Sequence, residues 1–218
     1  MAYFHSLDLP LPKDSTEYSN DGVFNKWFDQ ELRKSYVEGV VRKEIEKNQY
    51  PVLSKLDFIE ELKWLRKTIE ELKSPLVLSH NDLNRRNILI RETEGCPPEI
   101  FLIDFDWTNY NYRGVDLGQY YACFGQKEVD FGLIDFPSDE GMSVFIDAYV
   151  KQMNQLFGNQ YSKQNINSKE RLIKEAKVFA LMAFIKDIIY CIWVATTEGK
   201  VEIMVIIMVF FDSIQYLI

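Results

Sequence analysis

The sequence predicts an α+β fold that is mostly helical and contains one small β-hairpin near its middle. Three observations support this prediction. Apolar residues recur at three- and four-residue steps over long stretches on both sides of the centre. Short apolar runs gather between positions 76 and 103. Hydrophobic residues make up 47% of the 218 residues, which is ample for a buried core. We therefore expect one folded lobe over residues 1–218.

The first fifty residues are expected to be helical at both ends with a loop between them. A short helix is predicted up to Leu7, and Pro10 and Pro12 break it. The polar run 13–21 reads as a loop. Residues 23–48 are charged and are predicted to be mostly helical.

The clearest early helix follows Pro51. Ser54 is the predicted N-cap, with Asp57 at the third position of a capping box. Pro75 is predicted to end this helix. The apolar residues that form its buried face are Leu56, Ile59, Leu62, Leu65, Ile69 and Leu72.

Three short apolar runs then predict short buried strands, at 76–79, 88–90 and 100–103. The last two are joined by residues 91–99, which contain Gly95, Pro97 and Pro98. Because these residues favour turns, a β-hairpin is predicted here.

The rest of the chain is expected to be helical. The predicted helices cover 115–124, 139–157, 169–196 and 201–217, with loops near 132–137 and 158–167. The apolar stretch 178–195 carries Lys186 and Asp187 near its middle, and 203–211 is short. Both fall below the roughly 18 uninterrupted apolar residues of a membrane-spanning helix, so buried core helices are predicted. The start of the chain has no signal-peptide pattern.

Charge and cysteine content favour a cytoplasmic protein without a nucleic-acid partner. The formal net charge is -8 and the sequence pI is about 4.9, whereas nucleic-acid binders carry a basic face. The three cysteines are odd in number and form no CxxC pair. A reducing cytosol fits this pattern better than a disulfide framework or a zinc site.

Two polar clusters lie at the ends of the predicted hairpin. The first is H-N-D-L-N-R-R-N at 80–87, which has the spacing H-x-D-x-x-x-x-N, and the second is I-D-F-D at 103–106. Transfer of a phosphoryl group to a hydroxyl needs a carboxylate as base and oxygen ligands for Mg²⁺. Asp82 fits the base, Asn87 and Asp104 fit metal ligands, and Asp106 is a further candidate ligand. The alternative is that these Asp and Asn residues only cap turns.

His80 has two interpretations. It is either a structural histidine that bonds the backbone near the next loop, which we favour, or a group that transfers a proton.

Around these clusters the sequence resembles the choline/ethanolamine kinase family. The resemblance lies in S-H-N-D-L at 79–83 with N-I-L at 87–89, and in L-I-D-F-D at 102–106 followed by Y-N-Y-R-G-V-D-L-G at 110–118. Residues 1–10 resemble the helix that follows the hinge between the two lobes of such kinases. The resemblance runs from residue 1 to about residue 195.

This resemblance implies a protein-kinase-like C-terminal lobe, ATP and Mg²⁺ as cofactors, and choline or ethanolamine as the small-molecule acceptor. The implied reaction is the first step of phosphatidylcholine or phosphatidylethanolamine synthesis. It also implies that Asp116 braces the catalytic loop, although an Asp at a helix N-terminus is favoured in any case. Arg113 pairs with a loop carboxylate or is a solvated turn residue. The sequence leaves open whether the chain forms a homodimer.

Three departures from the family pattern matter, one of which is Cys123 in place of an acidic residue of the family. No G-x-G-x-x-G loop and no V-A-I-K-like strand occur, so the lobe that clamps ATP is expected to be missing. The family's aromatic substrate box is partly replaced, with Asp187 and Tyr190 at its two tryptophan positions and Trp193 nearby. These three are the candidate substrate residues, and Asp187 would favour a primary ammonium such as that of ethanolamine. The alternative is that Asp187 pairs with a neighbouring charge and the two aromatics belong to the core.

Two other functions remain as alternatives to an active kinase. A truncated lobe could act as a non-catalytic protein that binds a partner kinase subunit. A kinase for another small molecule, of the aminoglycoside phosphotransferase type, is less favoured because of the Y-N-Y-R-G string.

Overall fold

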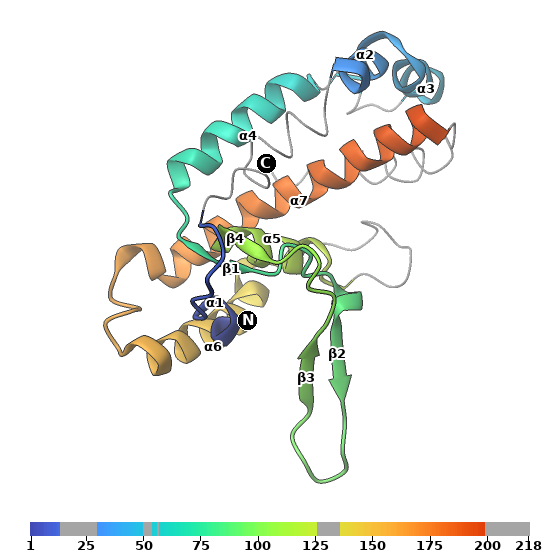
Figure 1. Cartoon of the computed structure of the whole chain (residues 1–218). Helices are drawn as coiled ribbons and strands as arrows, with labels where there is room; N and C mark the ends of the chain where they lie inside the picture. Colours follow the sequence, from blue (N-terminus) through green and yellow to red (C-terminus); the bar gives the residue numbers. More distant parts are fainter. Residues whose placement is uncertain (14–29, 50–53, 56, 126–135, 199–218) are drawn as a thin grey trace. The chain divides into compact units, whose positions relative to one another are not determined.

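The computed structural model describes residues 1–13, 30–49, 54–55, 57–125 and 136–198. These residues fall into two compact units, and we describe each by itself (Figure 1). The first unit comprises Met1–Ser15, Leu72–Phe124 and Pro137–Leu181, and the second comprises Thr16–Glu71, Gly125–Phe136 and Met182–Ile218. The prediction of one lobe over 1–218 stays a prediction.

The predicted mixture of many helices and a few short strands is confirmed. The first unit contains α1 (Ala2–His5), β1 (Leu76–Ser79), the 3-10 turn η2 (Arg85–Asn87), β2 (Ile88–Arg91), β3 (Glu99–Leu102), β4 (Asn109–Tyr112), α5 (Arg113–Ala122), α6 (Asp139–Phe157), the 3-10 turn η3 (Asn165–Asn167) and the start of α7 (Lys169–Glu198). The second contains α2 (Gln30–Glu38), α3 (Val40–Asn48), nearly all of α4 (Phe58–Leu72) and the rest of α7.

The strands form two separate antiparallel pairs. β2 pairs with β3, with Ile88 opposite Leu102, so the predicted hairpin is confirmed. β1 pairs with β4, with Ser79 opposite Asn109, and β4 was not predicted. Its N-Y-N-Y sequence alternates polar and aromatic residues, which is the period of a strand.

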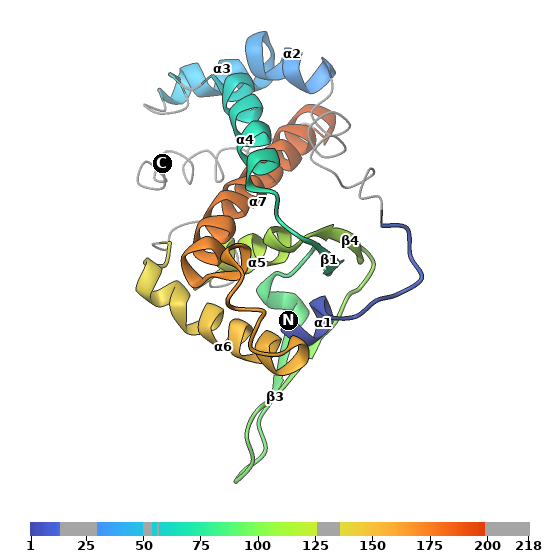
Figure 2. The same cartoon turned by 90° about the vertical axis from the view of Figure 1, so that its left-hand side faces the viewer.

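The prediction that the hairpin strands are buried is wrong. Leu89, Ile90, Ile100 and Phe101 are 43–67% exposed. The hairpin projects away from the helices of its unit (Figures 1 and 2). A two-stranded sheet has two faces, and both remain open to solvent here. Strand length and apolar content do not reveal whether another element covers a strand.

Two glycines let α5 lie directly against α7. A Cβ at Gly118 would lie 2.3 Å from the Phe179 carbonyl carbon, and one at Gly114 would lie 2.1 Å from the Phe179 ring. Such distances are impossible between real side-chain atoms, so only glycine permits this approach.

A buried ion pair fixes the same two helices. The Arg113 guanidinium is 1% exposed and pairs with Glu175 on α7 through Nε at 3.0 Å and Nη2 at 2.8 Å. Its Nη1 donates to Asn167 Oδ1 at 2.7 Å. Both predictions for Arg113 are therefore wrong, because its carboxylate partner lies on a helix and the residue is buried rather than solvated.

α6 matches its predicted bounds. Ser138 caps it by accepting a hydrogen bond from the Gly141 N–H at 3.2 Å. Its buried residues recur at three- and four-residue steps, and they are Met142, Ile146, Tyr149 and Met153. α6 contacts α1 within this unit (Figure 2).

In the second unit, α4 begins later than predicted. Asp57 accepts hydrogen bonds from the N–H groups of Ile59 and Glu60, both at 3.2 Å, and so acts as the N-cap in place of Ser54. The predicted apolar face is confirmed by the burial of Leu62, Leu65, Ile69 and Leu72, whereas Leu56 of that prediction lies outside the described residues.

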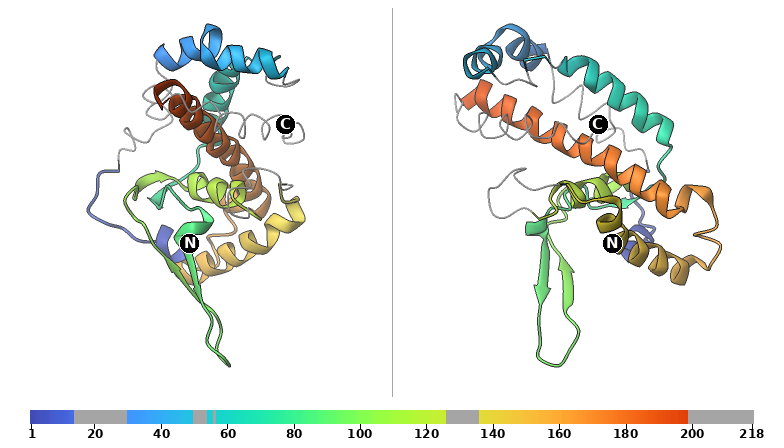
Figure 3. Two further views of the ribbon diagram at one scale, coloured as in Figure 1. Left: turned by 90° about the vertical axis from the view of Figure 1, so that its right-hand side faces the viewer. Right: turned by 180° about the vertical axis from the view of Figure 1, so that it is seen from behind.

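The helical stretch predicted for 23–48 is interrupted at Gly39, between α2 and α3. These two helices contact each other within the second unit (Figure 3). Residues 23–29 of that prediction and the helix predicted at 201–217 lie outside the described residues.

α7 begins with a charged stretch, and most of the apolar residues that follow are buried, as predicted. Among the described helices, it meets the length and composition expected of a membrane span, with a mean hydropathy of 2.0 over its most apolar window. Of that window, 59% is buried inside the structure, and core helices commonly meet the same criterion.

Candidate active site

Asp82 and Asn87 meet at the two ends of the turn between β1 and β2. The Asn87 side-chain Nδ2 donates to the Asp82 carboxylate Oδ2 and to the Asp82 backbone oxygen, both at 2.9 Å. Asn87 is buried and Asp82 is partly buried. Because the amide nitrogen is engaged with Asp82, the Asn87 Oδ1 is the atom left to accept or to bind a cation.

Ile103 places Asp104 beside this turn. The Ile103 N–H donates to the Asn87 backbone oxygen at 3.1 Å, and its carbonyl accepts from the His80 ring Nε2 at 2.9 Å. The next residue, Asp104, is exposed and has φ +64°, in the left-handed region that Asp tolerates better than most residues. The hairpin thus returns the chain from Asn87 to Asp104, as the sequence predicted.

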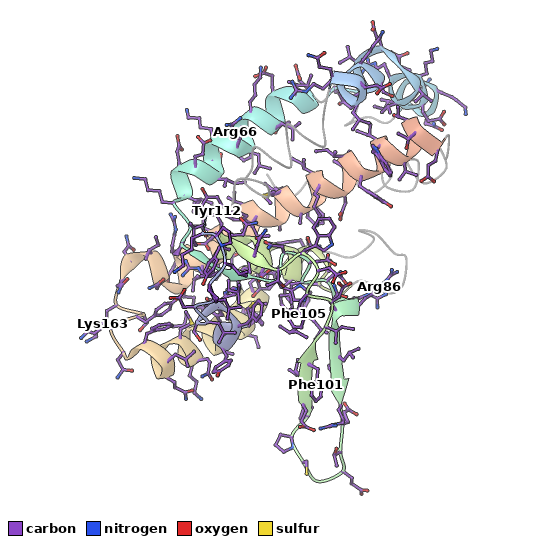
Figure 4. The ribbon with its side chains drawn as sticks, viewed as in Figure 1. Arg66, Arg86, Phe101, Phe105, Tyr112 and Lys163 are labelled. Atoms are coloured by element: carbon purple, nitrogen blue, oxygen red, sulfur yellow. The ribbon has the colours of Figure 1, made fainter. Side chains whose placement is uncertain are left out.

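His80 has the structural role that we favoured. Its side chain is fully buried and forms a hydrogen bond with the backbone oxygen of Ile103, the residue just before Asp104. A carbonyl can only accept, so Nε2 carries the proton. The ring centroid of Phe105 lies 5.1 Å from that of His80, at the base of the hairpin (Figure 4).

Asp116 braces the β1–β2 turn from α5. Its carboxylate is fully buried and accepts the backbone N–H groups of His80 and Asn81, both at 2.8 Å. This is the role that the resemblance implied. Burial alone would raise the pKa of Asp116, but the hydrogen bonds from His5 and from the two backbone N–H groups lower it below its ordinary value. Asp116 is therefore a buried anion that holds the two residues before Asp82.

His5 completes the brace, and sequence reasoning missed it. Its Nε2 lies 3.0 Å from Asp116 Oδ2, and its Nδ1 lies 3.0 Å from the Tyr149 hydroxyl. Burial lowers the pKa of His5 and raises the pKa of Tyr149. A neutral imidazole then donates Nε2–H to Asp116 and accepts the Tyr149 O–H. The one available signal was a histidine inside a short amphipathic helix, and it carried no partner information.

Asn81 ties the turn to β4. Its side-chain Nδ2 donates to the Trp107 backbone oxygen and to Asn109 Oδ1, both at 2.8 Å, and its Oδ1 accepts from Asn111 Nδ2 at 2.9 Å. Its φ of +63° lies in the left-handed region, where Asn is tolerated. The residue immediately before the predicted base is therefore fixed by its backbone and by its side chain.

The side chains predicted to bind Mg²⁺ are oxygen donors, and they would supply only part of the ion's ligands. Asn87 offers Oδ1, and Asp104 and Asp106 offer exposed carboxylates. Over the described part of the chain, no three His, Cys, Asp or Glu residues lie close enough to hold a metal by themselves. Mg²⁺ commonly binds one or two carboxylates together with waters and substrate phosphates, so a smaller donor set suffices.

The three candidate substrate residues all lie on the part of α7 that belongs to the second unit. Asp187 is partly buried. Tyr190 and Trp193 are 54% and 44% exposed, and their rings stack with centroids 6.0 Å apart. The alternative that these aromatics belong to the core is therefore wrong. Their role in binding substrate stays a prediction.

The order of these parts defines a class of protein. A strand, a turn with Asp and Asn five residues apart, a hairpin ending in Asp, and a helix that braces the turn together make the C-terminal lobe of a protein-kinase-like fold. The chain belongs to the choline/ethanolamine kinase family, whose sequence profile matches residues 1–213.

Curated relatives bear the names of both kinases. Choline kinase alpha of Mus musculus is 27% identical over 190 residues, which cover 83% of this chain and 40% of the relative. Ethanolamine kinase 1 of Homo sapiens is 32% identical over 125 residues, or 56% of this chain and 26% of the relative. Probable ethanolamine kinase A of Dictyostelium discoideum is 29% identical, covering 83% and 46%. The chain thus matches less than half the length of these three relatives.

Solved structures establish the same fold. An ethanolamine kinase of Plasmodium vivax matches 97% of this chain and 56% of its own, with a TM-score of 0.66 and 17% identity. Choline kinase from Cryptosporidium parvum Iowa II matches 98% of this chain and 63% of its own, with a TM-score of 0.58 and 21% identity. At these sequence identities, the structural similarity indicates a shared fold and nothing more.

Proposed function

We propose that this chain takes part in the ATP-dependent phosphorylation of the hydroxyl group of ethanolamine or choline, in the cytoplasm. The observation that carries the proposal is the pair of 2.9 Å hydrogen bonds from Asn87 to Asp82. They join the predicted base to a predicted metal ligand, while Asp116 holds the backbone just before Asp82. Turn-capping Asp and Asn residues would not require this second, buried carboxylate.

In this reaction Asp82 orients the acceptor. Its Oδ2 accepts the Asn87 amide, so Oδ1 is the oxygen that can accept the hydroxyl proton. As the acceptor oxygen forms its bond to the γ-phosphorus, the bond to the bridging oxygen of ADP breaks and the proton passes to Asp82. The products are a phosphomonoester and ADP. The fixed turn lets Asp82 hold this position without reorganising.

Asn87 Oδ1, Asp104 and Asp106 are the groups that would hold Mg²⁺, which neutralises charge on the transferring phosphate. Ile103 supports this assignment, because its two backbone hydrogen bonds fix the residue before Asp104.

For the acceptor, Asp187 favours a primary ammonium over a quaternary one, since an ammonium donates hydrogen bonds to a carboxylate. The exposed Tyr190 and Trp193 rings offer aromatic faces that attract a cation of either kind. We therefore propose ethanolamine as the preferred acceptor.

The test is turnover of ethanolamine and choline with Mg²⁺ and ATP by the wild type and by Asp82→Ala and Asp82→Asn. Loss of a general base should lower turnover by at least ~10²-fold in both variants. Asp147→Ala is the matched control, because it removes an exposed carboxylate paired with Lys169 on the surface. Near-normal turnover in the Asp82 variants would refute the role of Asp82.

A second candidate is a non-catalytic lobe that binds a partner kinase subunit. One observation favours it: the hairpin exposes apolar side chains. Mixing the chain with a full-length ethanolamine kinase separates the two functions. A chain that is inactive alone but changes the activity of the longer kinase would support this second role.

A further inference from the structure

We propose that Arg85 and Arg86 form a two-guanidinium site for the phosphate groups of the nucleotide. This inference deepens the proposed function and rests on it, because it places a phosphate-binding group in the same turn as Asp82. The position is the starting point. Both arginines belong to η2 and lie in sequence between Asp82 and Asn87, the two residues joined by the 2.9 Å hydrogen bonds.

The backbone that carries the two arginines is held by its own hydrogen bonds. Asn84 Oδ1 accepts the Arg86 N–H at 2.8 Å, and the Asn84 N–H donates to the Asp82 oxygen at 2.8 Å. The Asn87 N–H donates to the Asn84 oxygen at 3.1 Å, and the Ile88 N–H to the Arg85 oxygen. The turn therefore holds the backbone of two consecutive arginines close in sequence to the predicted base.

The two side chains have no ionic partner of their own. Both are exposed, and neither forms an ion pair with any residue that the structure describes, including Asp82, Asp104 and Asp106. Figure 4 shows Arg86 extending outward from the turn. Five other basic side chains of the first unit are paired with carboxylates, in Lys13–Asp8, Arg91–Glu99, Arg113–Glu175, Lys169–Asp147 and Lys177–Asp139.

Charge explains why a phosphate is the fitting ligand. The chain has a formal net charge of -8, and the predicted site contains three carboxylates. A nucleotide triphosphate would be repelled there unless positive charge is added beside that of Mg²⁺. A guanidinium supplies it, because its planar donors form paired hydrogen bonds with phosphate oxygens. Among the described residues, none of the four strands carries a lysine.

The experiment is a ³¹P NMR titration of Mg²⁺–ATP, and separately of Mg²⁺–tripolyphosphate, with the wild type and the double variant Arg85→Gln/Arg86→Gln. Phosphorus shifts and line widths report weak binding directly and need no turnover. Because hydrogen bonds to charged groups contribute substantially to binding, the double variant should bind both ligands about tenfold or more weakly than the wild type. The variant Arg85→Lys/Arg86→Lys should retain part of the affinity, since it keeps the charge but loses the paired donors.

Arg42→Gln is the matched control for charge, because Arg42 is a surface residue of α3 paired with Glu46. It should leave both affinities unchanged. Equal affinities for the wild type and the double variant, or no binding of tripolyphosphate by the wild type, would overturn the inference. Arg85 and Arg86 would then be surface residues without a role in phosphate binding.

The outcome for the proposed function is read separately. If the wild type binds tripolyphosphate through these arginines but phosphorylates neither ethanolamine nor choline, the proposed function fails and the phosphate site stands. If it phosphorylates ethanolamine and the double variant binds phosphate equally well, the reverse holds.

Discussion

The β1–β2 turn, which holds Asp82 and Asn87, and the hairpin that follows it are neighbours in sequence but are stabilised in different ways. In the turn, His80 and Asn81 are held by a buried carboxylate from α5, and that carboxylate is held by His5 from α1. In the hairpin, four backbone-paired residues on each strand lead to an exposed tip, with an Arg91–Glu99 ion pair on the surface. Surface ion pairs of this kind contribute little.

This difference teaches which part of the site is preorganised. The turn carries Asp82 and Asn87 on a backbone whose polar groups are satisfied by buried partners, so it should keep its geometry without a ligand. The hairpin brings Asp104 back to the turn, but its apolar side chains remain exposed. An isolated two-stranded hairpin is only marginally stable. We therefore expect large effects from substitutions behind the turn and small ones in the hairpin.

The largest effect is expected for Asp116→Ala. The variant leaves three buried donors without their acceptor, namely the N–H groups of His80 and Asn81 and the His5 Nε2–H. At about 1–3 kcal/mol for each unsatisfied donor, the loss should be roughly 3 kcal/mol or more. Urea unfolding measures it, and hydrogen exchange should speed up at the His80 and Asn81 amides. The exposed Asp106→Ala serves as control, and a similar loss in both variants would contradict the brace.

An intermediate effect is expected for Gly118→Ala, compared with Gly95→Ala at the hairpin tip. The new Cβ at position 118 would meet the backbone of α7 at 2.3 Å, and overpacking of this kind costs about 3 kcal/mol at the upper end of its range. Gly95 has open space around it, so Gly95→Ala should cost only about 1 kcal/mol from its φ of +77°. Equal unfolding midpoints in urea would show that α5 and α7 can separate without cost.

The smallest effect concerns the pH dependence of stability. Burial lowers the pKa of His5 from 6.5 in the folded state, so the unfolded chain binds more protons as the pH falls below that value. Stability should therefore be lost on acidification from pH 7 to pH 5, with a slope of at most about 1.4 kcal/mol per pH unit for one proton.

His5→Gln keeps a donor for Asp116 but cannot titrate, so its stability should change less over this range. His80 is present in both proteins, and the difference between the two unfolding curves isolates His5. Parallel curves from pH 7 to pH 5 would show that His5 titrates alike in the folded and unfolded states.

Several parts of the fold and of the candidate site were predictable from local sequence. The bounds of α6, the apolar face of α4 and the β2–β3 hairpin follow from periodicity and turn residues. The convergence of Asp82 and Asn87 follows from their spacing in a short turn between strands. β4 was not predicted because its four residues, N-Y-N-Y, contain no aliphatic run that would indicate a strand.

Other features depended on contacts between distant positions. The predicted N-cap of α4 was Ser54, but the helix begins later than its apolar pattern indicates and Asp57 caps it. Arg113 pairs with Glu175, which is 62 residues away in the sequence, and His5 forms a hydrogen bond with Asp116, which is 111 residues away. Neither pairing has a local pattern, because it depends on which helices pack together.

By itself, the sequence determined the family of the chain and the proximity of Asp82 and Asn87, since two residues five positions apart in a turn between strands must share one short loop. Only the tertiary structure decided that a buried Asp116–His5–Tyr149 chain holds that loop, that Arg113 is a core residue, and that the hairpin is exposed. The physical reason is that burial and long-range hydrogen bonds depend on what packs against a segment, and the segment's own residues do not specify this.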